Sequence, residues 1–241
     1  MPPLARRLAA EATGSAALVA VVVGSGIAAQ QLSPNDTGLQ LLENSTATVF
    51  GLAVLILVFG PVSGAHFNPA VSLADWLAGR RTGTGLPVTQ AAAYCAAQTL
   101  GAIVGAVVAN IMFDQAAGQI STHHRITSGH LIGEIVATAG LIALIFTLAR
   151  IGRTTLAPVA VAAWIGAAYW FTSSTSFANP AVTIGRIFTD SFAGIAPASA
   201  PGFIAAQLLG ALLGLGAVAV FYPATPAAAD DIVIPHSDTA R

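Results

Sequence analysis

The chain has 241 residues, of which 55% are hydrophobic and only 8% are charged, and its formal net charge is −1. Soluble domains carry about 25% charged residues, so this composition leaves too little charge to cover a water-facing surface. All nine basic residues are arginine, and a near-neutral chain has no basic footprint for nucleic acid. The single cysteine, Cys95, and five scattered histidines give no disulfide framework and no metal motif. The sequence therefore predicts an integral membrane protein without a cofactor.

Six apolar stretches approach or exceed the length of about 20 residues that crosses the hydrocarbon core. They cover approximately 8–30, 44–63, 88–112, 131–150, 156–174 and 199–222. Two shorter stretches, near 66–78 and 177–189, cannot cross, and each carries an Asn-Pro pair. We expect an all-α membrane protein, with six transmembrane helices and two re-entrant half-helices in a single channel domain over 1–241. The proline- and aspartate-containing end, 223–241, is expected to be a loose cytoplasmic tail.

Arginine placement predicts the orientation of the chain. Arg6 and Arg7 precede the first span, and most of the remaining arginines fall in the second and fourth connections, which share one side of the membrane. The positive-inside rule puts that side in the cytoplasm. With six spans, both termini are expected to be cytoplasmic in the inner (cytoplasmic) membrane.

The two halves of the sequence, about 8–112 and 131–222, resemble each other. The segment AAQTLGAIVGA at 96–106 recurs as AAQLLGALLGL at 205–215, and Asn-Pro-Ala-Val recurs 111 residues after its first occurrence. A unit of three spans starts and ends on opposite sides, so its second copy must be inverted. Inverted repeats with broken helices are a known plan for proteins that pass solutes.

The repeated Asn-Pro-Ala triplets carry the chemistry of the predicted half-helices. Asparagine is a strong N-cap, and proline suits the first helical position because it has no N–H to leave unsatisfied. We expect the small alanines to let the two helix ends meet near the middle of the bilayer, where the asparagine amides would donate hydrogen bonds to a passing oxygen and the helix dipoles would repel cations. The residues concerned are Asn68, Pro69, Ala70, Asn179, Pro180 and Ala181.

Glu11 and Glu134 are ionisable groups placed early in spans one and four. Such groups are costly in a membrane and are usually paired or functional. The favoured interpretation is that each carboxylate accepts hydrogen bonds from the exposed backbone of a half-helix loop. A proton-relay role is the alternative.

The segments SGAHFNPAVS (63–72) and FANPAVTIGR (177–186) resemble the major intrinsic protein family of aquaporins and aquaglyceroporins. The resemblance covers residues 8–222. It implies six spans with two half-helices, a pore through each subunit and a homotetramer.

The resemblance also implies a narrow outer filter made by four positions. Counting from the motif asparagines gives Thr48, Ala167, Ser176 and Val182, with a neighbour of Thr48 as the alternative first position. Val182 stands where the family usually has arginine. We therefore expect a wider aperture and a weaker barrier against cations than in a strict water pore.

The run from 179 to 207 is similar to the bacterial aquaglyceroporins associated with arsenic resistance, some of which carry valine in place of the filter arginine. That resemblance implies passage of neutral trihydroxy-arsenic, which has a shape like that of glycerol. Glycerol, urea and other small polyols are equally compatible with a widened neutral pore.

Two further residues are candidate vestibule residues. His66 either lines the pore or bonds the loop backbone, and Arg186 either lends positive potential to the outer vestibule or extends to the membrane interface. The aromatic residues are interpreted as interface or packing groups rather than as pore residues. They are Trp76, Trp164, Tyr169 and Trp170.

We therefore predict a passive channel for small uncharged solutes, including glycerol-like polyols, trihydroxy-arsenic and water, and not an enzyme. A strict water channel and a proton-coupled secondary transporter that uses Glu11 and Glu134 are the alternatives. A structural membrane protein with a closed pore is a further one. The expected partners are the lipid bilayer, small solutes and identical subunits, without nucleic acid.

Overall fold

The computed structural model describes residues 2–80 and 83–223, and the elements assigned in these ranges are helices. Six of them are long and apolar enough to cross a membrane. These six are α1 (Leu4–Leu32), α2 (Thr37–Ser63), α4 (Val88–Met112), α5 (Ser128–Arg150), α6 (Ala157–Phe171), which the short helix η1 (Thr154–Leu156) precedes, and α8 (Ala200–Phe221). The predicted all-α class with six spans is confirmed.

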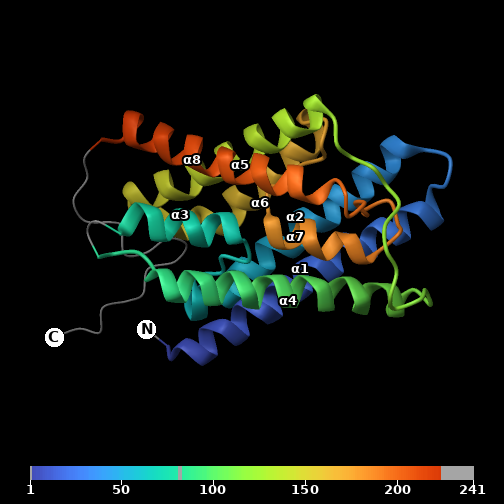
Figure 1. The fold of residues 1–241 in the computed structure, drawn as a ribbon, viewed down its shortest axis with the longest axis horizontal. Helices are drawn as coiled ribbons and strands as arrows, with labels where there is room; N and C mark the ends of the chain where they lie inside the picture. Colours follow the sequence, from blue (N-terminus) through green and yellow to red (C-terminus); the bar gives the residue numbers. More distant parts are fainter. Residues whose placement is uncertain (1, 81–82, 224–241) are drawn as a thin grey trace.

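Two short helices lie between the spans. They are α3 (Pro69–Gly79) and α7 (Pro180–Gly185), the latter extended by the 3-10 turn η2 (Arg186–Phe188). Figure 1 shows α3 and α7 near the middle of the bundle, nearly in line with each other. Neither element is long enough to cross, as the sequence predicts. The predicted tail, 223–241, lies outside the described residues except for Pro223.

Helix ends follow local capping. The second span begins at Thr37 rather than near 44, because the side chain of Asp36 accepts a hydrogen bond of 2.9 Å from the backbone N–H of Leu39. It ends at Gly64, whose φ of 89° lies in the left-handed region that glycine adopts freely. The chain then continues into the loop before α3.

Glycines bring the spans of each half into close contact. A Cβ placed on Gly101 or Gly105 of α4 would lie 2.1 Å from a backbone oxygen of α1. In the second half, a Cβ on Gly210 or Gly214 of α8 would lie 2.5 Å from a backbone oxygen of α5. The α1–α4 and α5–α8 pairs therefore depend on small residues, which is the usual basis of close packing between membrane helices.

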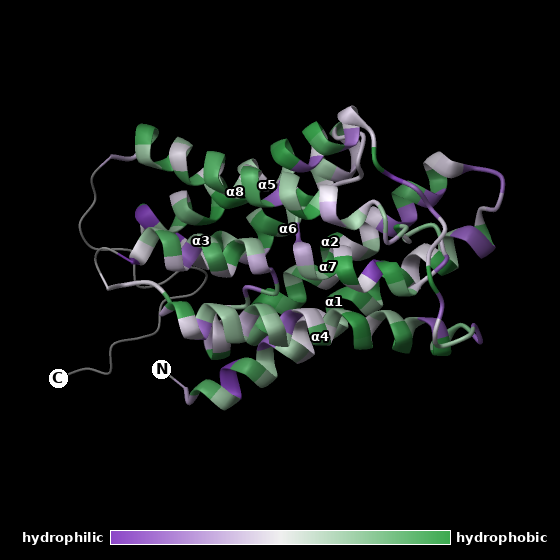
Figure 2. Cartoon of the chain, in the orientation of Figure 1, coloured by the Kyte–Doolittle hydropathy of each residue, from purple (hydrophilic) through white to green (hydrophobic). Residues whose placement is uncertain are grey.

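The long helices expose apolar side chains on their outer faces. Phe50, Val159 and Val220, for example, are 68%, 70% and 71% exposed. Figure 2 shows that hydrophobic residues dominate the length of these helices, whereas hydrophilic ones gather towards the ends and in the connections. This distribution fits a lipid-facing surface.

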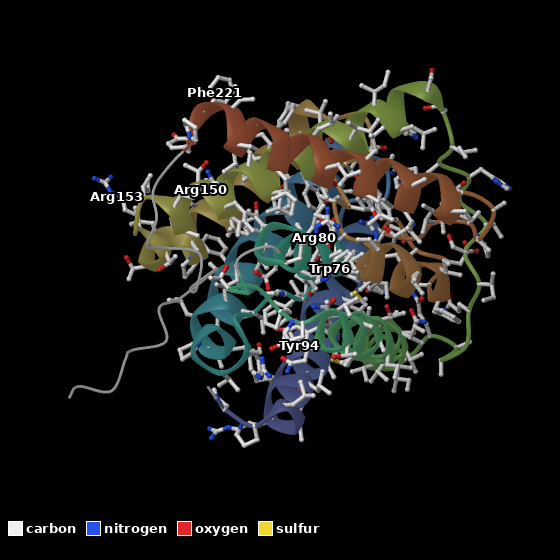
Figure 3. The ribbon with its side chains drawn as sticks, turned by 60° about the vertical axis from the view of Figure 1, so that its left-hand side comes forward. Trp76, Arg80, Tyr94, Arg150, Arg153 and Phe221 are labelled. Carbon is white, nitrogen blue, oxygen red and sulfur yellow. The ribbon has the colours of Figure 1, made fainter. Side chains whose placement is uncertain are left out.

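Arginines occupy the end of the bundle at which α3 and α5 end. Arg80 lies with its Cζ 5.9 Å from the ring centroid of Trp76, and Figure 3 shows Arg150 and Arg153 near the end of α8 that carries Phe221. We call this the α3 end. The opposite end, where the segment after η2 lies, is called the α7 end.

Candidate channel and selectivity filter

The two half-helices start in the same way. The side chain of Asn68 accepts a hydrogen bond of 2.9 Å from the N–H of Ala70. The side chain of Asn179 accepts one of 3.0 Å from Ala181 and one of 3.2 Å from Val182. Asparagine therefore satisfies N–H groups that water cannot reach, and the proline after it has none to satisfy.

The same two asparagines also link the halves to each other. Asn68 Nδ2 donates to the carbonyl oxygen of Ala178 at 2.8 Å, and Asn179 Nδ2 donates to that of Phe67, also at 2.8 Å. An amide nitrogen carries two hydrogens, so each cross-link leaves one donor for another acceptor. Both asparagines line the cavity described below.

The loop before each half-helix has an unusual backbone. Ala65 and Phe67 have φ values of 49° and 48°, and their counterparts Ser176 and Ala178 both have 47°. Residues other than glycine rarely adopt this left-handed region, so the surrounding structure must hold them there. The repeat in the sequence is thus also a repeat in the backbone.

Two buried carboxylates hold these loops. Glu11 accepts hydrogen bonds from the backbone N–H of His66 at 3.0 Å and of Phe67 at 2.7 Å. Glu134 accepts from Phe177 at 2.9 Å and from Ala178 at 2.8 Å. Both glutamates have zero exposure, and their oxygens satisfy backbone groups that lipid would leave without a partner.

A glutamine extends each of these networks. Gln98 Nε2 donates to Glu11 at 2.7 Å and to the hydroxyl of Ser72 at 2.9 Å. In the second half, Gln207 Nε2 donates to Glu134 at 2.7 Å and to the hydroxyl of Thr183 at 2.8 Å. We call these two glutamate–glutamine networks the cradles. The sequence contains both glutamines at equivalent places of its repeated segments, which is the signal that could have identified them.

One cavity runs between the two asparagines and is lined by both halves. Its walls are mainly apolar, and they include residues from equivalent places of the two repeats. The apolar wall includes Leu18, Val22, Leu52, Ile56, Leu141, Ile145, Val161 and Ile165, and the groups that can donate or accept hydrogen bonds are Thr48, His66, Asn68, Tyr169, Ser176, Asn179 and Arg186. Such a lining can pass a small polar molecule along a few fixed partners.

Three of the four predicted filter residues, Thr48, Ser176 and Val182, line this cavity. Among the neighbours of Thr48, Phe50 is 68% exposed on the outer face of α2, whereas Leu52 lines the cavity together with Thr48. The hydroxyl of Ser176 is enclosed and has no hydrogen-bond partner among the described residues.

Ala167, predicted to be a filter residue, is not among the residues that line this cavity. It is exposed on α6, and Ile165 and Tyr169 of the same helix face the cavity instead. Counting back from Asn179 does not reach a residue of this cavity, because the loop between α6 and the half-helix sets the spacing independently of the helical period. The signal that could have corrected it is the four-residue spacing of Val161, Ile165 and Tyr169, which puts them on one helix face.

Tyr169, expected to be a packing residue, is therefore a cavity residue. Its hydroxyl lies 3.3 Å from that of Thr48. Thr48 donates its single hydroxyl hydrogen to the carbonyl oxygen of Asn44 at 2.8 Å, so Tyr169 must be the donor in the pair. Both hydroxyls then present their remaining lone pairs as acceptors.

Arg186 is 2% exposed and lines the cavity, so it does not extend to the membrane interface. Its Nε donates to the carbonyl oxygen of Ala193, and its Cζ lies 3.4 Å from the ring centroid of Phe177. Arg125 approaches the same ring, with its Cζ 5.5 Å from the ring centroid. Burial lowers the pKa of Arg125 from its usual value.

His66 lines the cavity, and no hydrogen bond from its ring to the loop backbone is recorded among the described residues. Its Nδ1 is 3.0 Å from the hydroxyl of Ser72, its N–H is bound to Glu11, and its ring packs edge-on against Tyr94 with centroids 5.4 Å apart.

Comparison with known proteins agrees with this geometry. Residues 2–176 match the major intrinsic protein family. The chain is 47% identical to the aquaglyceroporin AqpS of Rhizobium meliloti (strain 1021), over 92% of this chain and 93% of that protein. It is 34% identical to aquaporin NIP1-1 of Zea mays, over 76% of this chain and 64% of that protein.

A solved structure shows the same fold. The X-ray structure of the aquaglyceroporin from Plasmodium falciparum aligns with a TM-score of 0.64 at 22% identity, covering 92% of this chain and 98% of that one. The chain is a multi-pass membrane protein and belongs to the major intrinsic protein family.

Proposed function

We propose that this protein is a passive channel that conducts small uncharged solutes, such as glycerol-like polyols, down their gradient. The observation that carries the proposal is a cavity lined by both Asn68 and Asn179, each with an amide hydrogen left over after its cross-link. Its similarity to a protein named as an aquaglyceroporin supports the same assignment.

The chemistry of the cavity favours neutral molecules with hydroxyl groups. A solute that leaves water loses its hydrogen bonds, and burying it without replacements is costly. The central amides replace donors, while the Thr48–Tyr169 pair offers oxygens. The apolar wall between them fits the carbon side of a polyol.

Trihydroxy-arsenic belongs to this proposal as a substrate, because it is neutral and carries hydroxyl groups in a compact shape. Val182 supports it, since an aliphatic side chain leaves more room at the filter than an arginine would. Passage would then depend on whether the solute is charged, and not on whether it is built on arsenic or on carbon.

A strict water channel is the second candidate, and a specific observation favours it. Tyr169 and Arg186 bring bulk to the cavity where Ala167 and Val182 alone would have left it open. If these side chains close the filter to glycerol, water flux alone would remain.

The proton-coupled transporter finds less support. Each carboxylate oxygen of Glu11 already accepts two hydrogen bonds, from the loop, Ser63 or Gln98. Glu134 Oε2 also accepts two, and Glu134 Oε1 accepts one. Protonation would break such bonds. A transporter predicts saturable uptake that collapses in Glu11→Gln, whereas a channel predicts near-linear flux without any proton gradient.

We further propose an inner-membrane homotetramer with the α3 end in the cytoplasm. Arg80 follows the last residue of α3, Arg150 is the last residue of α5, and Arg153 precedes η1, so all three belong to the α3 end, which the positive-inside rule assigns to the cytoplasm. The tetramer is tested by measuring the mass of the detergent-solubilised protein, and the orientation by protease access in intact cells.

The function is tested by stopped-flow flux in proteoliposomes, comparing water, glycerol and neutral arsenite. Fast flux of all three supports the wide channel, water alone supports the strict water channel, and vesicles no leakier than protein-free ones contradict any channel. Asn179→Asp is the matched variant, because a carboxylate can still cap α7 but cannot donate to Phe67 or to a solute. We expect it to lose most of the flux, and full activity would contradict the role of the central donors.

A further inference from the structure

Arg186 has a side chain of which only part is used by the fold. Its Nε is bound to the carbonyl oxygen of Ala193, and its flat face lies on the ring of Phe177. The structure records no hydrogen bond from its two terminal nitrogens to any residue in 2–80 or 83–223. A buried guanidinium normally uses its fork of donors fully, because each unsatisfied donor is costly.

The position of these terminal nitrogens explains why they lack a protein partner. Arg186 is 2% exposed overall, yet it lines the cavity together with Ser176 and Val182. The nitrogens are also absent from the fully enclosed polar atoms that have no partner, which include the hydroxyl of Ser176. The donors therefore face the space through which a solute passes.

The charge of Arg186 is isolated within the cavity. Among the described residues that line it, Arg186 is the single side chain with a permanent charge. The carboxylate of Glu134 is bound by loop N–H groups and Gln207 rather than by arginine. In a narrow space with apolar walls, such a charge acts strongly on any ion that enters.

Phe177 fixes the position of the charge. Stacking at 3.4 Å on an aromatic face holds a planar guanidinium in one orientation, and Phe177 is itself held by its N–H bond to Glu134. The second cradle thus positions both Asn179 and, through Phe177, the guanidinium of Arg186.

We infer that Arg186 is a fifth filter position, one helical turn beyond Val182, whose terminal nitrogens bind an oxygen of the passing neutral solute and whose charge keeps cations out. The inference rests on the proposed function as a channel. It implies that the filter keeps an electrostatic barrier although residue 182 is valine. The aperture at Val182 and the charge at Arg186 are then set by separate residues.

Arg125 provides a matched control. It approaches the same phenylalanine ring, but its Nε and Nη2 donate to the carbonyl oxygens of Gly194 and Phe192, both at 2.7 Å. It does not line the cavity. The guanidinium of Arg125 is therefore bound to loop carbonyl groups and does not lie at the cavity.

The test uses the full chain in proteoliposomes, with glycerol flux measured by light scattering and sodium and proton flux measured under an imposed membrane potential. For Arg186→Gln we expect the ratio of cation flux to glycerol flux to rise at least about tenfold, because the repulsion by a fixed charge is lost. Arg125→Gln should leave this ratio near that of the unaltered protein. Both are normalised to folded protein.

Arg186→Lys is a second variant that keeps the charge and removes the planar fork. We expect it to retain the barrier to cations but to change the relative rates of urea and glycerol, since an ammonium does not present paired donors. It remains informative if Arg186→Gln does not fold.

The inference is overturned if Arg186→Gln excludes cations as well as the unaltered protein, if Arg125→Gln leaks as much as Arg186→Gln, or if Arg186→Lys loses the barrier. These outcomes are separate from a failure of the channel proposal, which would show as an absence of glycerol and water flux in the unaltered protein.

Discussion

The two half-helices of this channel begin alike and end differently. Each begins with an asparagine that caps its own helix and binds a carbonyl of the other half, and each follows a loop held by a glutamate. One turn after the repeated valine, however, α3 has Asp75 and α7 has Arg186. Both side chains are buried, at 4% and 2% exposure.

The surroundings of these two residues explain the difference. Asp75 accepts a hydrogen bond of 2.9 Å from the N–H of Leu86 and does not line the cavity, whereas Arg186 does. The starts of the half-helices are fixed by the need to satisfy backbone groups inside a membrane, which is the same in both halves. Their ends face different connections, so they can carry opposite charges and separate tasks.

The largest expected effect comes from removing a cradle. Glu134→Ala leaves the N–H groups of Phe177 and Ala178 and the amide of Gln207 without their acceptor. Each unsatisfied buried donor costs about 1–3 kcal/mol, so we expect a loss of more than about 3 kcal/mol in the free energy of unfolding. Thermal unfolding in detergent measures it.

Glu11→Ala should be destabilising to a similar degree if the two halves are equivalent. Glu43→Ala is the control, because Glu43 accepts one hydrogen bond of 2.8 Å, from Ser33, in a partly exposed place. A melting temperature of Glu134→Ala that matches that of the control would contradict the loop-holding role.

Helix packing provides the next comparison between the halves. A methyl group on Gly101 would meet a backbone oxygen of Ala12 at 2.1 Å, and one on Gly210 would meet that of Ile135 at 2.5 Å. We expect Gly101→Ala to cost about 1–3 kcal/mol through overpacking, and Gly210→Ala to cost less. Gly216→Ala, where a methyl group would meet nothing within 4 Å, should leave the melting temperature unchanged or raise it. The reverse ranking in thermal unfolding would contradict this account.

The filter gives a smaller and more selective effect. Val182→Arg places a second guanidinium one turn from Arg186, so we expect glycerol flux to fall by about tenfold and water flux by much less, because the aperture narrows. Stopped-flow rates measure both. Val182→Leu adds bulk without charge and should have an intermediate effect. Equal loss of every solute in Val182→Arg would count against the filter assignment.

The smallest effect is expected at the α7 end, in the loops. The N–H of Thr122 donates to Asp190 at 2.8 Å, and this bond lowers the pKa of the carboxylate below its usual value. A lowered pKa means that the carboxylate stabilises the folded state above the unfolded pKa of about 3.9 and loses this contribution as the pH falls further.

Asp190→Asn should therefore slightly lower the melting temperature at neutral pH, and the difference from the unaltered protein should shrink towards pH 3. Melting curves between pH 7 and pH 3 measure it. A difference that stays constant across this range would show that the carboxylate charge contributes nothing.

Much of the fold could be predicted because the bilayer limits the choices. Span lengths, the charges of Glu11 and Glu134, and the paired Asn-Pro motifs each have few explanations inside a membrane. Their contacts in the structure follow directly from the shortage of water as a hydrogen-bond partner. The start of α2 was less predictable, since capping by Asp36 occurs beyond the apolar stretch.

The filter was harder to predict because it depends on which helix face meets the cavity. Ala167 and Tyr169 lie on the same helix and differ in direction, and a count from Asn179 contains no information about helix rotation. The length and charge of the Arg186 side chain are compatible both with a position at the membrane interface and with a buried position. The deciding partner, the ring of Phe177, is brought to it by the loop backbone.

The crossed hydrogen bonds from Asn68 to Ala178 and from Asn179 to Phe67 also have a consequence for biosynthesis. The ribosome delivers the first half to the membrane long before residue 178 is made, so during that interval the first re-entrant loop has no partner for its amide or for the carbonyl of Phe67. The newly inserted first half must therefore keep this loop in contact with water or with the insertion machinery. The crossed hydrogen bonds can therefore form only after the second half has been made.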